Sequence, residues 1–197
     1  MKRLLLAAVF GFFCLGAGPA CRDAAELEQE ARAATRDFMT TLKGHLGAAI
    51  KESGPAHAIA VCSEVAPRIA ARISRERGWE VGRTSLRLRN TANLPEAWEE
   101  EILERFAGEH EAGAAVAQLE YSDVVEVSGE KRFRYMKAIP TQEICLQCHG
   151  ENLHGEVREQ LSRDYPHDQA TGFALEDIRG AFTIEMPLPE TKKDSGS

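Results

Sequence analysis

The chain has 197 residues, of which 43% are hydrophobic and 28% charged, and its formal net charge at pH 7 is −7. An acidic balance argues against binding to nucleic acid and against electrostatic docking on anionic lipid. The length suits a single domain with a core of its own.

Residues 1–20 have the layout of a secretory signal peptide. A positive start, Met1 to Arg3, precedes an uncharged apolar run, Leu4 to Leu15, and small residues follow up to Ala20. The apolar run is shorter than the ~20 residues that a spanning helix requires. We therefore expect export to the periplasm with cleavage after Ala20, and an uncleaved membrane anchor is the alternative.

Cleavage after Ala20 would make Cys21 the first mature residue. A lipid anchor on that thiol is one outcome, and plain release into the periplasm is the other, because Gly18 stands where lipoprotein signals usually carry a leucine-like residue. We expect one domain over residues 24–188 and a flexible tail over residues 189–197.

Two N-terminal helices are expected. Residues 24–50 lack proline and repeat apolar side chains at helical spacing, and Gly54-Pro55 should end this helix. A second helix runs up to Gly78 and carries Cys62 on its apolar face. Pro67 removes a backbone hydrogen bond inside this helix, so its axis should bend near Cys62.

After Gly78 the spacing of apolar residues changes from the helical period to an alternation of every second residue. Residues 84–89 alternate apolar and polar side chains, which predicts a half-buried strand. Further expected elements are a helix opened by a capping-box pattern at residues 93–96, a hairpin of residues 118–127 and 131–139, a short helix over residues 156–163 and a strand over residues 178–186. Helices followed by antiparallel strands predict an α+β domain.

The most specific motif is Cys145-Leu146-Gln147-Cys148-His149, expected in a loop after Pro140. Two thiols separated by two residues can add to the two vinyl groups of a porphyrin, and the adjacent histidine then lies under the iron. The sequence contains this pattern once, so it predicts one covalently bound haem c per chain, held by Cys145 and Cys148, with His149 as an iron ligand.

Two other kinds of site use similar residues. A CxxC disulfide or redox pair would not need His149. A zinc site could use Cys145, Cys148, His149 and His154, but ligands adjacent in sequence strain a tetrahedral centre. Haem attachment explains all three residues of the motif.

The second iron ligand remains open on residue chemistry alone. Methionine or histidine is the usual choice, and Cys62 is a buried-face cysteine with no obvious partner. The candidates are Cys62, Met136, Met186, His45, His57, His110, His154 and His167. Three arginines, Arg83, Arg87 and Arg89, would share one strand face and could bind the haem propionates, although a solvated strand face is the commoner explanation for such a row.

Four motifs resemble, in order, those of one known family. They are Ala60–Ala70 around Cys62, Arg87–Glu99, Tyr135–Ile139 with Cys145–Gly150, and Gly172–Phe182. The chain is similar in these segments to the PAS-like c-type haem family, long catalogued as a domain of unknown function. The resemblance implies a PAS-like antiparallel sheet with added N-terminal helices. It also implies iron held by His149 and Cys62. Should Cys62 not be the ligand, Met136 or a histidine from the candidates above is next in line.

The resemblance further implies sensing of redox state or of a small gaseous ligand. Family members often precede signalling modules, and we expect none after this domain, which weakens direct signalling. A thiolate favours Fe(III), and loss of Cys62 on reduction would open a site for CO or NO. A low-potential electron carrier with a redox partner protein is the alternative, and a haem enzyme is a third. We expect no catalytic reaction.

Overall fold

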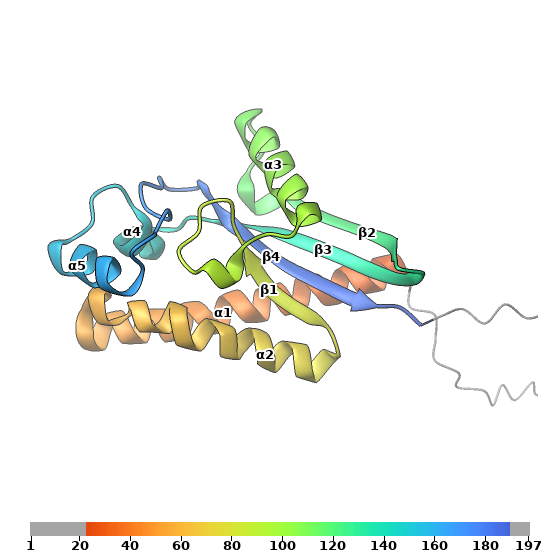
Figure 1. The fold of residues 1–197 in the computed structure, drawn as a ribbon, viewed down its shortest axis with the longest axis horizontal. Coiled ribbons are helices and arrows are strands. Elements are labelled where there is room, and N and C mark those ends of the chain that lie inside the picture. Colours follow the sequence, from red (N-terminus) through yellow and green to blue (C-terminus); the bar gives the residue numbers. More distant parts are fainter. Residues whose placement is uncertain (1–22, 190–197) are drawn as a thin grey trace, which may run out of the picture.

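The computed structural model describes residues 23–189. The predicted signal peptide, Cys21 and residues 190–197 of the predicted tail lie outside the described residues. A four-stranded antiparallel sheet forms the centre, with a pair of N-terminal helices on one face and a single helix on the other (Figure 1). The expected α+β class, with N-terminal helices and an antiparallel sheet, is confirmed.

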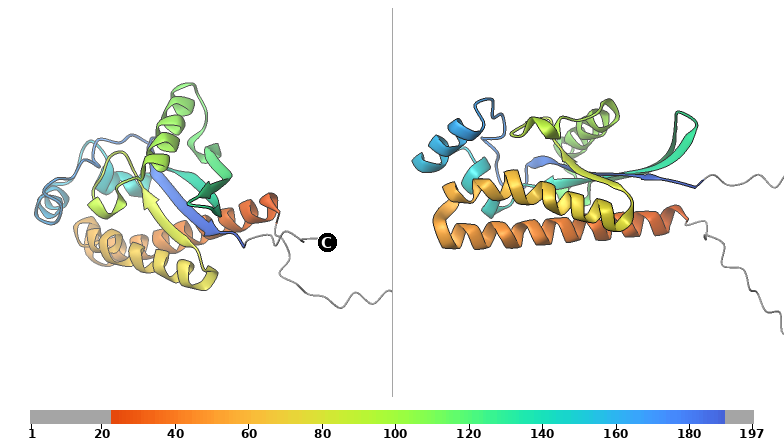
Figure 2. Two further views of the ribbon diagram at one scale, coloured as in Figure 1. Left: turned by 45° about the vertical axis from the view of Figure 1, so that its right-hand side comes forward. Right: turned by 60° about the horizontal axis from the view of Figure 1, so that its bottom comes forward.

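The two N-terminal helices form an antiparallel pair beneath the sheet (Figure 2). Helix α1, Ala24–His57, begins at the N-cap Asp23 and loses helical geometry at Gly54, where φ is 82°. Helix α2, Ala66–Arg77, has Pro67 in its first turn and ends at Gly78 in the left-handed conformation. None of the helices in residues 23–189 is long and apolar enough to cross a membrane.

The break expected near Cys62 is a π-helical turn, Val61–Val65, here called η1. Its last amide, that of Ala66, donates to the carbonyl oxygen of Val61. Pro67 follows directly and cannot donate, so the regular hydrogen-bonding pattern starts afresh after this turn. Cys62 therefore lies on an irregular turn between two helices, where single π-turns often serve functional sites.

The sheet has the order β1-β4-β3-β2. Its strands are β1 (Glu80–Thr84), β2 (Glu120–Val127), β3 (Glu130–Pro140) and β4 (Ile178–Pro187). The predicted hairpin is β2–β3, whose turn has positive φ at Ser128 and Gly129, as a type I′ turn requires. One face packs Phe133, Tyr135, Phe182, Ile184 and Met186 against α1 and α2. The other packs Met136, Ala138 and Ala181 against helix α3, Ala97–Glu111.

Three local predictions were wrong. The strand predicted over residues 84–89 does not form, because β1 ends at Thr84 and the hydroxyl of Ser85 accepts from the amide of Arg87, which turns the chain. Helix α3 starts one turn later than expected, with Glu96 and Glu99 forming the capping box. The haem motif lies on a short helix, α4 (Glu143–His149), and not in a loop. The expected short C-terminal helix is α5, Gly155–Asp164.

Candidate haem site

A cavity opens at one end of the sheet. It lies between the C-terminal half of α1, the π-turn η1, the adjoining ends of β1 and β4, and helix α4. Figure 1 shows α4 at one end of the molecule, above the end of α1. All three motif residues, Cys145, Cys148 and His149, line it, and so does Cys62.

Helix α4 presents both motif thiols on one face. Cys145 and Cys148 are three residues apart, which places them side by side on a helix. Both are free thiols. Burial raises the pKa of both, that of Cys148 to about 11, so they are held as neutral thiols at neutral pH.

The two ring nitrogens of His149 have different partners in the protein. Its Nδ1 lies 2.6 Å from the carbonyl oxygen of Ala170, which can only accept, so Nδ1 carries the proton. The other nitrogen, Nε2, therefore keeps its electron pair, and Nε of Arg179, which can only donate, lies 3.5 Å from it. Burial holds the pKa of His149 well below its usual value, with the positive charges of Arg179 and Arg89 adding to the effect. A neutral imidazole fixed by a backbone carbonyl is the form in which histidine ligates metals.

The backbone of His149 is held by the same segment. Its carbonyl oxygen accepts from the amide of Phe173 at 2.9 Å, and Gly150 pairs with Phe173 in an isolated β-bridge. The rings of His149 and Phe173 meet edge to face, with centroids 6.2 Å apart. Residues 168–173, here called the histidine loop, thus orient the imidazole through both backbone and side-chain contacts.

Arg89 secures the histidine loop to α4. Its guanidinium donates to the carbonyl oxygens of Cys148 at 2.6 Å and Ala170 at 3.1 Å, and it pairs with Asp168 at 2.9 Å. Arg87 donates to carbonyl oxygens of the same loop. The predicted shared strand face of Arg83, Arg87 and Arg89 was therefore wrong, because only Arg83 belongs to a strand. Arg87 and Arg89 hold the loop in place through Nε and Nη2 of their guanidinium groups.

A position on the cavity distinguishes Cys62 from the seven other candidates for the second iron ligand. Of the eight, Cys62 alone lines it within the described residues. The side chains of His45, His57, His154 and His167 are exposed elsewhere, and that of His110 contacts Ala114 at the end of α3. The π-turn thus places a thiol on the cavity that His149 also lines.

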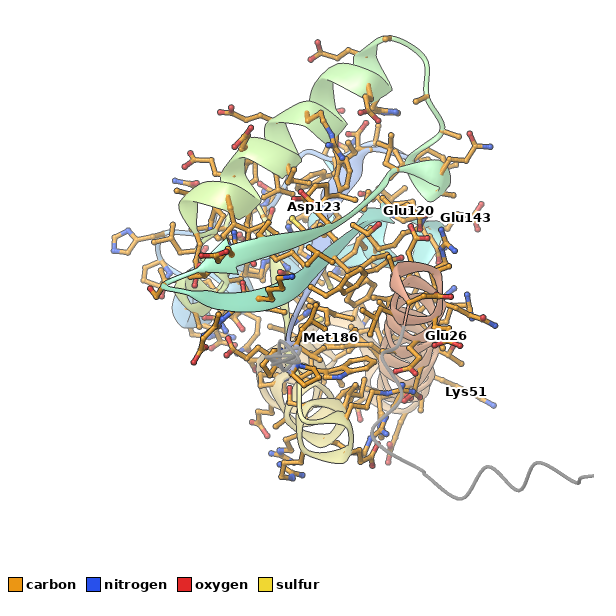
Figure 3. All side chains as sticks on the ribbon, turned by 90° about the vertical axis from the view of Figure 1, so that its right-hand side faces the viewer. Glu26, Lys51, Glu120, Asp123, Glu143 and Met186 are labelled. Atoms are coloured by element: carbon orange, nitrogen blue, oxygen red, sulfur yellow. The ribbon has the colours of Figure 1, made fainter. Side chains whose placement is uncertain are left out.

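The two methionine candidates lie away from the cavity. Met136 is fully buried on the α3 face of the sheet, opposite to the face that meets the cavity, so the structure does not bring this fallback candidate together with His149. Met186, labelled in Figure 3, is six residues along β4 from Gly180, roughly 20 Å at the usual rise of a strand.

Sequence reasoning missed one sulfur in the cavity, that of Met39. It lies on α1, next to Phe38, and lines the cavity together with Leu42 and Leu46 one and two turns further on. Its helical spacing from these residues was visible in the sequence, and it should have joined the candidates. Met39 is therefore the structural alternative to Cys62.

A family model for Tll0287-like domains matches residues 19–187. The chain belongs to the Tll0287-like family. The crystal structure of the cyanobacterial heme-protein Tll0287 matches with a TM-score of 0.64 and 22% sequence identity, over 86% of this chain and 99% of that chain. This likeness confirms the fold. No curated protein matches the chain.

The residues of this Tll0287-like cavity fit a haem group. Two thiols on one helical face, a neutral imidazole, a third thiol and an apolar lining meet there, with cationic side chains from Lys43, Arg83 and Arg179. Carboxylate groups such as haem propionates need cationic partners. The zinc alternative needs several ligands around one point, and residues 23–189 contain no cluster of three or more His, Cys, Asp or Glu side chains able to share a metal ion.

Proposed function

We propose that this protein is a periplasmic monohaem c protein that senses redox state or a small gaseous ligand. Cys145 and Cys148 would hold one haem covalently, and His149 and Cys62 would be its axial ligands. The observation that carries the proposal is that Cys62, alone among the candidates drawn from the sequence, shares a cavity with all three motif residues within the described chain.

Each residue has a distinct task in this proposal. His149 offers Nε2 because Nδ1 donates to Ala170, and the histidine loop keeps the ring from turning. Cys62 offers an anionic sulfur, which favours Fe(III) over Fe(II). The bound haem would supply a redox-active iron and, where one axial position is vacated, a place for CO or NO.

Cys62 is the proposed responsive ligand. It lies on the π-turn, which joins the end of α1 to α2 and is preceded by the non-helical geometry of Gly54. His149, in contrast, is fixed by three contacts to one loop. The ligand on the irregular turn is the one placed to move when the charge on the iron changes. We propose no catalytic reaction for the protein.

Absorption spectra of the native protein, oxidised, reduced, and reduced under CO, test the proposal. A low-spin ferric spectrum of thiolate character, followed by CO binding after reduction, is expected. A spectrum that stays six-coordinate in both states and refuses CO would favour electron transfer to a redox partner. Turnover of peroxide or of nitrogen oxides would favour a haem enzyme.

Export is proposed from the sequence of residues 1–20. Intact-mass measurement of protein from its native host should find the chain without these residues. Added lipid mass would place an anchor on Cys21, and its absence would indicate free periplasmic protein. A chain that begins at Met1 in the cytoplasm would contradict the proposal.

A further inference from the structure

Arg179 lies against the imidazole of His149. It belongs to β4, and its side chain lines the cavity. The Nε atom of Arg179 is 3.2 Å from Nδ1 of His149 and 3.5 Å from Nε2. Nδ1 cannot accept this N–H, because it carries the proton that it donates to Ala170. The contact is therefore more than an ordinary hydrogen bond to one ring nitrogen.

The two distances place the Nε atom of Arg179 over the face of the ring. A donor that approaches one imidazole nitrogen in the ring plane, along its electron pair, lies much farther from the other nitrogen. Nearly equal distances to both nitrogens require a position above the plane, where the N–H meets the π electrons. A metal ion, in contrast, binds Nε2 in the plane of the ring. Arg179 can therefore keep its contact with His149 while Nε2 binds iron.

The turn after β1 holds Arg179 in this position. Its Nη1 donates to the hydroxyl of Ser85 at 3.1 Å and to the carbonyl oxygen of Arg87 at 3.2 Å. Its guanidinium also lies 5.3 Å from the centroid of Phe173, the ring that meets the imidazole edge to face. No carboxylate in residues 23–189 forms an ion pair with Arg179. The positive charge is thus fixed beside the imidazole and is not neutralised by a partner.

A fixed cation on an axial ligand favours reduced iron. Reduction of Fe(III) to Fe(II) adds one electron to the centre, and a nearby positive charge stabilises the added negative charge. A cation over the ring also draws electron density away from Nε2 and weakens it as a donor to Fe(III). Both effects raise the reduction potential, whereas a thiolate ligand such as Cys62 lowers it.

We propose that Arg179 is a positioning residue for His149 that raises the reduction potential of the haem iron, and so sets the potential at which the sensor switches. This inference rests on the proposed function, of which it uses the haem and the ligand His149. It does not depend on the identity of the second ligand.

The test compares Arg179→Gln, Arg179→Lys and Arg87→Gln in the haem-loaded protein by their midpoint reduction potentials. Arg87 is the matched comparison, because its guanidinium lies 4.1 Å from the centroid of the same Phe173 ring and donates to the histidine loop. Unlike Arg179, however, Arg87 is exposed and does not line the cavity. Should Arg179→Gln fail to accumulate, Arg179→Met replaces it.

Arg179→Gln should lower the midpoint potential by the equivalent of about tenfold or more in the one-electron equilibrium constant, which is ~59 mV. Arg179→Lys keeps the charge and should recover most of this loss. Arg87→Gln should cause a clearly smaller fall, because water screens an exposed charge. An unchanged potential in Arg179→Gln, a fall that Arg179→Lys does not reduce, or an equal fall in Arg87→Gln would overturn the inference.

The pH dependence of the potential separates contact with His149 from pairing with a haem carboxylate. If Arg179 paired with a propionate, its loss would let that carboxylate take up a proton more readily, and the potential would gain a dependence on pH. We expect the fall in Arg179→Gln to be the same across neutral pH. A pH dependence that the unmodified protein lacks would overturn the inference.

His149→Ala separates failure of the inference from failure of the proposed function. If this variant leaves the ferric absorption spectrum unchanged, His149 is not the iron ligand, and the proposed function and the inference both fail. If His149→Ala changes the spectrum while Arg179→Gln leaves the potential unchanged, the inference alone is wrong.

Discussion

His149 Nδ1 lies 2.6 Å from the carbonyl oxygen of Ala170, a residue 21 positions further along the chain. Because a carbonyl oxygen can only accept, this contact selects the tautomer that leaves Nε2 without a proton. The motif in the sequence therefore supplies the ligand, while a distant loop decides which of its two nitrogens is available.

Covalent attachment is the first expectation. Protein made with a periplasmic haem-attachment system should keep its haem through acid–acetone extraction, and its denatured mass should exceed that of the apoprotein by one haem. Cys148→Ala should weaken or abolish this retention, because one of two thioether bonds is lost. Cys62→Ala is the matched control and should leave attachment intact. Purified native protein that holds zinc and shows no haem absorption would contradict the site.

Removal of the proposed thiolate ligand should raise the reduction potential. Cys62→Ala takes an anionic donor from the iron and should leave the sixth position open or filled by water. The measurements are the ferric absorption spectrum and the midpoint potential. Met39→Leu is the control, since Met39 is the other sulfur outside the motif that lines the cavity. If Met39→Leu alters the spectrum and Cys62→Ala does not, the ligand is Met39.

Asp168→Ala should destabilise the fold strongly. The side chains of Asp168 and Arg89 are only 10% and 7% exposed, so removing the carboxylate leaves a buried guanidinium without its anion. Breaking such a pair costs about 3–5 kcal/mol in free energy of unfolding, measurable by urea denaturation. The surface pair of Arg105 and Glu109 is the comparison, and Glu109→Ala should cost less than about 1 kcal/mol. Equal losses of unfolding free energy in Asp168→Ala and Glu109→Ala would contradict the role of Arg89 in holding the loop that orients His149.

Gly180→Ala tests the close approach of β4 to the end of β1. A Cβ atom at this position would lie 2.4 Å from the carbonyl oxygen of Thr84 and 3.0 Å from Cβ of Ser85, so backbone must move. We expect a loss of about 1–3 kcal/mol in thermal or urea unfolding. Gly108→Ala, in α3 with nothing within 4 Å of the added atom, should instead stabilise by up to about 1 kcal/mol. An unchanged unfolding stability in Gly180→Ala would mean that the backbone can move apart here at little energetic cost.

The loss of folding stability at acidic pH should depend on Glu120. This carboxylate, at the start of β2 beside α1 (Figure 3), accepts two hydrogen bonds from Nε and Nη2 of Arg32 and one from the hydroxyl of Tyr135 at 3.0 Å. Arg32, ahead of the opposing effect of burial, lowers the pKa of Glu120. Its stabilisation is therefore complete above the unfolded value of about 4.3 and is lost as pH falls through the lower folded pKa.

Glu120→Gln should accordingly be less stable at neutral pH and lose stability less steeply as the solution is acidified below about pH 4.3. Tyr135→Phe keeps the carboxylate and its contact with Arg32, so its slope should lie between those of Glu120→Gln and the unmodified protein. Urea unfolding across this pH range measures all three. Identical slopes for Glu120→Gln and the unmodified protein would contradict the assignment.

The local elements that the sequence predicted well are those with local causes. The hairpin rests on two positive-φ residues, Ser128 and Gly129, and the break near Cys62 on one proline. The strand at residues 84–89 failed because the hydroxyl of Ser85 also donates to the carbonyl oxygen of Arg179, 94 residues away. The alternation of apolar and polar residues cannot predict a hydrogen bond to a residue so distant in the sequence.

The site divides in the same way. Cys145, Cys148 and His149 lie within five consecutive residues, so haem attachment could be predicted from their spacing in the sequence alone. The pairing of Arg89 with the histidine loop and the cavity position of Met39 depend on how distant elements pack. The distance of Met136 from the cavity follows from the face of the sheet on which its side chain lies. The register of β3 decides that face.

The strand order has a consequence for how the molecule can assemble. Strand β4, the last in the chain, is inserted between β1 and β3, so β1 has no neighbour in the sheet until residues 178–187 arrive. The N-terminal half cannot complete its fold as the polypeptide emerges, and pairings this far apart in sequence close slowly. A chain truncated before Ile178 should remain an incomplete intermediate, prone to aggregation, with the hairpin β2–β3 as its one preformed pair of strands.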